Sequence, residues 1–268
     1  MTKIAIREAL LPGETVHSRL ALARELGFAG VEFAAEQLEE RIDVIDEALR
    51  AQGLVASGLN MGETDGWVSA DRARRQSAND RLREALACAL DLEAEYVTFA
   101  PQIGASDMPD LTPFASPMDL QKEMLIWLLR GFSDLADAMD AKLALLPLNS
   151  GKTAFLTRLE QADQFCREVN HHPKITIAAS AGEMALEEAD IIGCLKSHLE
   201  RISVIYLTDR GMRLPGRGGL PFPEIGQALR ERDYRGWLVI DGRASHTGRE
   251  GSSELAACLD LLRDCGLA

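Results

Sequence analysis

The sequence has no apolar run long enough to span a bilayer, and its opening stretch, MTKIAIREALLPGE, is too weakly apolar for a signal peptide. Basic residues are also scarce: 29 Lys and Arg stand against 42 Asp and Glu, a formal net charge of −13. Nucleic-acid binding requires a basic face that neutralises phosphates, and anionic membranes attract basic surfaces. We therefore expect a cytoplasmic protein that binds neither nucleic acid nor membranes.

Paired cysteines are missing as well. The five cysteines are Cys88, Cys166, Cys194, Cys258 and Cys265. They form no CxxC motif, and four of the five lie in helix-like patterns. Spacing of this kind predicts reduced thiols in the core or on the surface of a cytosolic protein rather than a disulfide framework.

Short apolar strands alternate with amphipathic helices along all 268 residues, without a linker or a break in composition. Such alternation predicts parallel strands with crossover helices, and eight repeats predict closure into one (β/α)8 TIM barrel domain over residues 1–268. An open doubly wound sheet would need a glycine-rich phosphate turn after the first strand, and REALLPGE offers none. The expected strands are 3–6, 30–34, 54–60, 95–101, 142–149, 174–180, 202–205 and 236–241. The expected helices are 15–26, 35–52, 70–92, 118–139, 152–169, 185–199, 224–231 and 252–262.

In such a barrel the site lies at the carboxyl ends of the strands. The residues expected there are Glu32, Asn60, Glu63, Gln102, Leu146, Asn149, Ser180, Glu183, Tyr206, Asp209, Arg213, Asp241, Arg243 and His246. The connection over residues 102–117 is the longest, and long ordered loops tend to be functional.

The loop after the seventh strand is rich in arginine and glycine: YLTDRGMRLPGRGGLPF. A fixed guanidinium presents paired donors to a carboxylate or phosphate, so Arg213 is a candidate ligand for an anionic substrate group. A solvated arginine, or one paired with Asp209, explains the residue equally well.

Four segments resemble the xylose isomerase-like barrel superfamily of sugar isomerases and epimerases, which also includes a group of AP endonucleases. They are ELGFAGVEF, the LPLN of the fifth strand, YLTD with PGRGGLPF, and YRGWLVID. They occur in the right order over nearly the whole chain. The resemblance implies a small carbohydrate or a hydroxy or keto acid as substrate, and possible homo-oligomers.

The resemblance also implies a divalent metal held by a Glu, an Asp, a His and a Glu at the ends of strands five to eight. Carried over, these positions are Leu146, Ser180, Tyr206 and Asp241, with Ala179 in place of Ser180 if the register slips by one. Leucine cannot coordinate, and isolated carboxylates rarely hold a divalent ion. We therefore expect no metal cofactor at this site. A DNA-repair nuclease, which needs a metal cluster and a basic rim, is the least favoured function.

The remaining residues predict a site for proton transfer without metal. Glu183 and Asp241 are the candidate catalytic carboxylates, unless they form salt bridges with Arg213 or Arg243 across the mouth. Tyr206 either binds substrate or only fills the former metal space. Asn149 either bonds a sugar hydroxyl or caps a helix.

His246 is the one histidine expected on the site face, where a solvated side chain is the alternative to a substrate contact. Two functions stay open for the chain. One is an isomerase- or epimerase-like enzyme. The other is a catalytically silent barrel that binds an anionic metabolite or a partner protein through the degenerate site.

Overall fold

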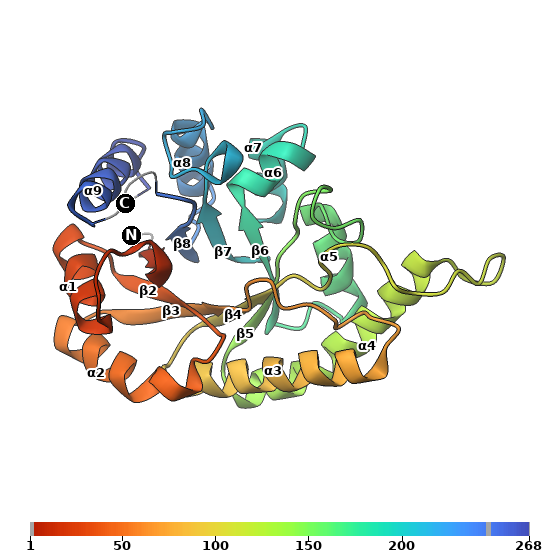
Figure 1. Ribbon diagram of the computed structural model, residues 1–268. Helices are drawn as coiled ribbons and strands as arrows, with labels where there is room; N and C mark the ends of the chain where they lie inside the picture. Colours follow the sequence, from red (N-terminus) through yellow and green to blue (C-terminus); the bar gives the residue numbers. More distant parts are fainter. Residues whose placement is uncertain (1–2, 245–247, 268) are drawn as a thin grey trace.

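The computed structural model describes residues 3–244 and 248–267 and shows a closed barrel of eight parallel strands (Figure 1). The strands pair in chain order, and β8 closes the barrel against β1. The predicted (β/α)8 fold is therefore confirmed. The strands are β1 (Lys3–Arg7), β2 (Gly30–Ala34), β3 (Val55–Asn60), β4 (Tyr96–Phe99), β5 (Lys142–Leu145), β6 (Ile175–Ser180), β7 (Ile202–Leu207) and β8 (Trp237–Ile240).

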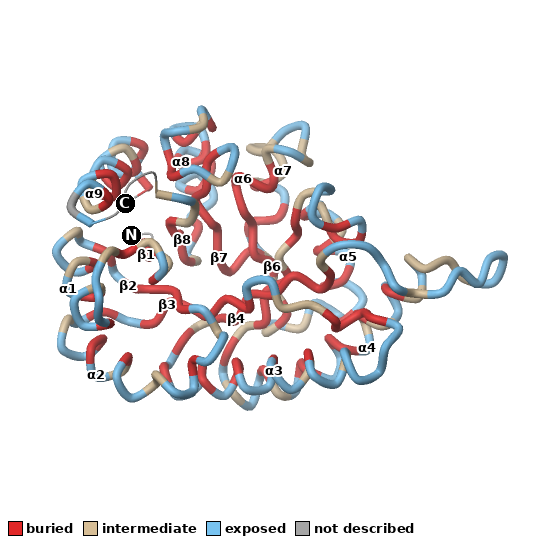
Figure 2. Tube along the Cα trace, viewed as in Figure 1, coloured by how far each residue is buried: buried red, intermediate tan, exposed pale blue. Residues whose placement is uncertain are grey.

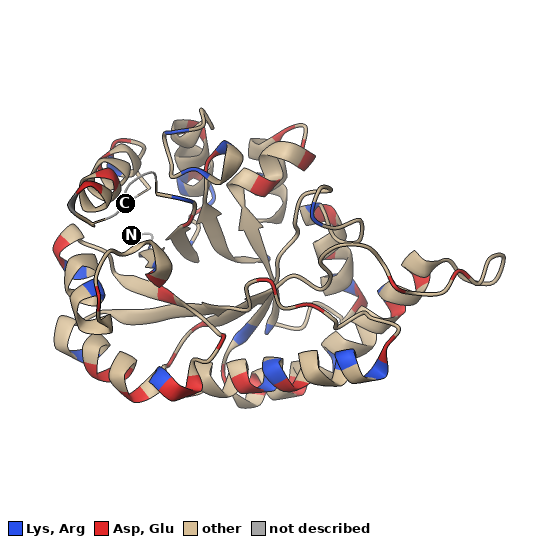
Figure 3. Ribbon diagram, viewed as in Figure 1, with Lys and Arg blue, Asp and Glu red and all other residues tan. Residues whose placement is uncertain are grey.

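Helices surround the barrel, with their buried residues toward the sheet and their exposed residues outward (Figure 2). The helices are α1 (Val16–Leu26), α2 (Ile42–Gln52), α3 (Arg72–Asp91), α4 (Pro117–Ala138), α5 (Leu159–Glu168), α6 (Ala181–Glu187), α7 (Ile191–His198), α8 (Phe222–Glu231) and α9 (Gly248–Asp264). Short 3-10 turns cover Glu8–Leu10, Glu39–Arg41 and Arg210–Met212. Charged side chains are spread along the outer helices (Figure 3).

Local capping explains several of these boundaries. Thr15 and Ser18 form a capping box at the start of α1, and Gly27 ends the helix in the left-handed region with φ 95°. Ser116 and Asp119 form the same box at α4, where Pro117 occupies the first turn. These are sequence signals, so both helices begin close to their predicted starts.

Several helix predictions were wrong in extent. The helix expected over residues 35–52 begins only at Ile42, after the 3-10 turn, and the helix expected over residues 252–262 is longer and spans Gly248–Asp264. The single helix expected over residues 185–199 is divided into α6 and α7, because Glu188 has extended backbone angles and Asp190 caps α7 anew. The helix expected from residue 152 starts only at Leu159. The preceding residues form a loop at the barrel mouth, which places Lys152 beside the site instead of on an outer helix.

The barrel interior is filled by a few bulky rings opposite very small residues. Tyr96, Tyr206 and Trp237 are buried there beside alanines and valines. A Cβ on Gly58 would stand 2.1 Å from the Tyr96 ring, and one on Gly30 would stand 2.9 Å from Trp237. These strand glycines are therefore required for packing.

The connection between β4 and α4 projects away from the barrel (Figure 1). Leu111 and Ala115 form a narrow antiparallel turn within it, and Phe114 at its end is 93% exposed. Only the base of the connection, at Ile103 and Gly104, reaches the barrel mouth.

The five cysteines are free thiols, as predicted, and four of them are buried. Within the described part of the chain, no helix has the length and apolar character needed to cross a membrane.

Candidate active site

A cavity of about 480 Å³ opens at the carboxyl ends of the strands, where the sequence places the site. Side chains alternate between the two faces of a strand. A residue two positions after one that faces the barrel interior therefore also faces inward, at the open end of the barrel. The cavity is lined by Arg7, Asn60, Gly62, Glu63, Ile103, Gly104, Leu146, Leu148, Gly151, Lys152, Ser180, Glu183, Tyr206, Met212 and Asp241. Seven of the predicted positions are therefore brought together: Asn60, Glu63, Leu146, Ser180, Glu183, Tyr206 and Asp241.

A larger hollow of about 800 Å³ lies at the opposite end of the barrel, between the turns that precede β5, β7 and β8. Residues at that end of a TIM barrel serve stability rather than chemistry. The smaller cavity is the better candidate because polar strand-end side chains converge on it.

The floor of the site is a buried network around Glu32. Its Oε1 accepts hydrogen bonds from the hydroxyls of Tyr206 at 2.6 Å and Tyr96 at 3.0 Å. The Tyr206 hydroxyl also lies 2.8 Å from both Asn60 Nδ2 and Thr98 Oγ1. Burial raises the pKa of Glu32 to about 7, although Arg7 and the two tyrosines act against this rise. The Tyr206 hydroxyl is therefore hydrogen-bonded to protein partners, at the position where the family resemblance implies a histidine ligand.

Arg7, at the end of β1, connects this floor to Asp241. Its Nε lies 3.3 Å from Glu32 Oε2, and its Nη1 donates to Asp241 Oδ1 at 3.1 Å. Burial alone would lower the pKa of Arg7, but the carboxylates of Glu32 and Asp241 raise it above its ordinary value. The guanidinium is therefore charged. It was missed from the sequence because the first strand was expected to end at Ile6, one residue earlier.

Glu183 is held on another wall of the cavity. Ser180 caps α6, which places Glu183 in its first turn. Its Oε2 accepts from the backbone N of Asn149 at 2.8 Å and from its Nδ2 at 2.5 Å, and its Oε1 lies 2.6 Å from Lys152 Nζ. The salt bridge considered with Arg213 or Arg243 is in fact made with Lys152. Asn149 holds this carboxylate and does not line the cavity.

Asp209 has a structural role in the arginine- and glycine-rich loop. Its buried carboxylate accepts four backbone N–H groups at 2.7–3.0 Å, from Arg210, Gly216, Gly218 and Leu220. A Cβ on Gly218 would stand 2.5 Å from Asp209 Oδ1, so the glycine permits this close approach. The carboxylate has no capacity left for a substrate hydroxyl.

Arg213 is not among the residues that line the cavity. Its side chain is exposed, its Nη1 donates to the carbonyl of Arg217 at 3.1 Å, and the neighbouring Met212 lines the cavity instead. Its link to Asp209 runs through the backbone alone. His246 lies outside the described residues, so its predicted substrate contact stays a prediction.

The four positions that correspond to metal ligands do not fit a divalent ion. Leu146 supplies only hydrocarbon, and the Ser180 hydroxyl caps α6. Tyr206 is bonded to three side chains, and Asp241 is paired with Arg7. Ala179, the alternative to Ser180, is buried in the hydrophobic core and has no ligand atom in its side chain. One carboxylate already paired with a cation is a poor site for Mg²⁺ or Mn²⁺.

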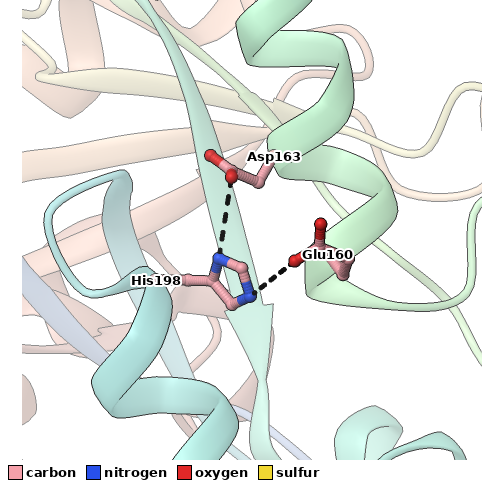
Figure 4. Close-up of side chains that lie close together, drawn as sticks. All are labelled: Glu160, Asp163 and His198. Carbon is pink, nitrogen blue, oxygen red and sulfur yellow. Dashed lines mark ion pairs between the residues drawn. The ribbon is translucent and has the colours of Figure 1, made fainter.

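Among the described residues, one group has donors close enough for a metal: Glu160, Asp163 and His198, on α5 and α7 of the outer layer (Figure 4). The imidazole Nδ1 faces Asp163 at 4.0 Å and its Nε2 faces Glu160 at 3.5 Å. An imidazole binds a metal ion through one nitrogen, whereas here its two nitrogens face different carboxylates. A single ion would therefore not bind all three side chains in this arrangement. Arg167 also pairs with both carboxylates, which indicates an ion-pair network between helices.

Comparison with known proteins identifies the family of the chain. The family described as xylose isomerase-like TIM barrel matches residues 20–265. The 3-dehydro-D-guloside 4-epimerase of Escherichia coli is 25% identical over 88% of this chain and 90% of its own. The D-psicose 3-epimerase of Enterocloster bolteae is 31% identical over 51% of this chain and 44% of its own.

The fold is also similar to that of a solved structure. The structure of 3-keto-D-glucoside 4-epimerase from Escherichia coli superposes with a TM-score of 0.88, covers 99% of this chain and 100% of its own, and is 21% identical. The relatives named by these comparisons are sugar epimerases. The chain belongs to the xylose isomerase-like TIM barrel family.

Proposed function

We propose that the protein is a sugar epimerase or isomerase that works without a divalent metal. It binds a small carbohydrate, or a hydroxy or keto acid, at the mouth of the barrel and moves a proton at the carbon beside a carbonyl group. The sugar epimerases among its relatives support the reaction class. The poor fit of the four strand-end positions to an ion supports the absence of metal.

One observation carries the proposal: two carboxylates line the same cavity, and each is fixed by a different cation. Asp241 enters from the end of β8 beside Arg7, and Glu183 enters from α6 beside Lys152. The two ion pairs hold these carboxylates in place, and fixed carboxyl groups suit proton transfer to and from carbon.

The reaction follows from this arrangement. Asp241 removes the proton from the carbon beside the carbonyl, and the electrons of the broken C–H bond form a carbon–carbon double bond while the carbonyl oxygen becomes an enolate. The Glu183–Lys152 pair, whose ammonium carries a transferable proton, returns one to the carbon and restores the carbonyl. Solvent then takes the proton from Asp241 and reprotonates Lys152, which restores the starting state. Return to the opposite face inverts the centre. Leu146, Leu148 and Ile103 form an apolar wall that excludes water from the enolate.

Solvent exchange tests this function. The protein is incubated in D₂O with D-psicose, D-fructose or D-tagatose, and deuterium incorporation beside the carbonyl is followed by NMR. We expect incorporation by the wild type and a loss of about 10²-fold or more in Asp241→Asn and Glu183→Gln. Glu160→Gln, on the outer layer, is the control and keeps the wild-type rate.

The alternative is a barrel that binds a ligand without chemistry. The hydrogen bonds that occupy Glu183 and Asp209 favour it, because saturated carboxylates are typical of structural roles. Suppose that none of the three ketoses incorporates deuterium, while calorimetry shows saturable binding of a ketose to the protein. This result would support the alternative over the enzyme.

A further inference from the structure

Arg7 is a fixed cation at the floor of the cavity, and the mechanism above leaves its charge without a chemical task. Two buried or nearly buried carboxylates hold it: the Glu32 side chain is 0% exposed and that of Asp241 is 13% exposed. Its own side chain is 28% exposed, so part of the guanidinium faces the cavity. It is both anchored and accessible.

The contacts of Arg7 determine which part is free. Its Nε faces Glu32, and its Nη1 donates to Asp241. Within the described part of the chain, no protein acceptor is bonded to Nη2. A guanidinium carries five N–H donors in a planar fork, so this edge is available to a ligand oxygen.

Lys152, the other cation of the cavity, is less suited to such a task. Its side chain is 41% exposed at the wall, and its ammonium is 2.6 Å from Glu183. A flexible and hydrated ammonium gives a weaker and less directed field than a guanidinium held at two of its nitrogens. The directed cation of this site is Arg7.

The position of Arg7 relative to Asp241 completes the argument. An enolate forms readily when a cationic donor contacts the carbonyl oxygen while a base contacts the adjacent C–H bond. Arg7 and Asp241 are in direct contact at 3.1 Å, so a carbonyl oxygen at Nη2 brings its neighbouring carbon close to the carboxylate. We propose that Arg7 donates to the substrate's carbonyl oxygen and stabilises the enolate formed when Asp241 takes the proton, a role that rests on the function proposed above.

The step balances without a further reactant. The C–H proton moves to Asp241, the C–H electron pair forms the carbon–carbon double bond, and the carbonyl π pair moves to the oxygen bonded to Arg7. Reprotonation of the carbon reverses these changes. Arg7 keeps its own protons throughout and therefore supplies the electrostatic stabilisation that a metal ion supplies elsewhere.

The test separates this contact from turnover. L-Erythrulose, a ketose too short to form a stable ring, is labelled with ¹³C at its carbonyl and bound to the wild type, to Arg7→Lys and to the double variant Arg7→Met with Glu32→Gln. Arg7→Lys keeps the charge but loses the fork. The double variant removes the cation together with the buried carboxylate it neutralises, so that folding, followed by the urea midpoint, is preserved.

We expect the bound wild type to shift the carbonyl resonance downfield. In both variants that shift is lost, and deuterium exchange beside the carbonyl falls about 10²-fold. Arg7→Lys with both the shift and the exchange of the wild type would overturn the assignment while leaving the epimerase function standing. A shift that depends on Arg7, in a wild type that exchanges no deuterium, would support the contact and reject the epimerase function.

Discussion

Tyr206 donates its hydroxyl to Glu32 at 2.6 Å, across the barrel from β7 to β2. Each of these two residues is 1% exposed, so this hydrogen bond is made away from water. It occupies the place where the family resemblance implies a metal-bound histidine. The centre of the barrel mouth is thus closed by a hydrogen-bonded network, and the open cavity lies above it.

Removing the Tyr206 hydroxyl should destabilise the fold. Tyr206→Phe leaves Glu32, Asn60 and Thr98 without a shared partner in a buried site, and an unsatisfied buried polar group costs about 1–3 kcal/mol. The free energy of unfolding in urea measures the loss. Tyr234→Phe is the control, because its buried hydroxyl makes one long bond of 3.4 Å to the carbonyl of Trp237. Equal losses in the two variants would contradict the account.

Glu32 should make stability depend on pH. Burial raises its pKa from 4.5 to about 7, so the folded state binds its proton more tightly than the unfolded state does. Its contribution is therefore fully present below about pH 4.5 and is lost as pH rises through 7. At about 1.4 kcal/mol per unit, the loss is on the order of 3 kcal/mol.

The measurement is urea unfolding of the wild type and Glu32→Gln between pH 4.5 and 8. Other titrating groups affect both proteins alike, so the difference between the curves isolates Glu32. We expect the wild type to lose stability relative to the variant as pH rises. Parallel curves would show that Glu32 titrates normally in the folded protein.

Lys152 should matter for activity more than for stability. Lys152→Met removes the transferable proton next to Glu183, while Asn149 still supplies two donors to that carboxylate. We expect deuterium exchange to fall about 10²-fold and the free energy of unfolding to change by about 1 kcal/mol or less. Lys174→Met, which breaks an ion pair with Asp140 before β6, is the matched control with unchanged exchange. A Lys152→Met enzyme with wild-type exchange would assign the pair a structural role.

A glycine should tolerate substitution by alanine only where the structure leaves space for a Cβ. Gly218→Ala places a Cβ 2.5 Å from Asp209 Oδ1 and 2.6 Å from the N of Arg210, so the carboxylate must lose its loop amides. We expect a loss of about 1–3 kcal/mol in the free energy of unfolding. Gly131→Ala in α4 meets nothing within 4 Å and should instead stabilise by about 0.5–1 kcal/mol. A neutral Gly218→Ala would show that Asp209 does not depend on this close approach.

The architecture could be predicted from the sequence because each strand is a short apolar run and several helices carry their own caps. Thr15, Gly27 and Ser116 are examples whose effects are local. The break between α6 and α7 was not predictable in this way, since Asp190 reads equally well as a polar residue on the exposed face of one long helix.

The site was predicted in part, for a different physical reason. Glu183 and Asp241 follow from their positions after strands, but their cationic partners are set by tertiary contacts. Arg7 ends the first strand and pairs with Asp241, directly after the last strand, and Lys152 lies in a loop whose sequence resembles a helix start. Arg213 shows the reverse error: loop arginines look alike in sequence, and the neighbouring Met212, with φ 59°, lines the cavity instead. The predicted homo-oligomer stays a prediction.

Deuterium exchange into a ketose, measured after treatment with a chelator, tests the central claim that this sugar epimerase site needs no divalent ion. The purified protein is analysed for bound metal, dialysed against EDTA, and assayed in D₂O with D-psicose before and after addition of Mn²⁺. The account predicts substoichiometric metal and the same exchange rate in both assays. A stoichiometric ion, or exchange that appears only when Mn²⁺ is added, would contradict it.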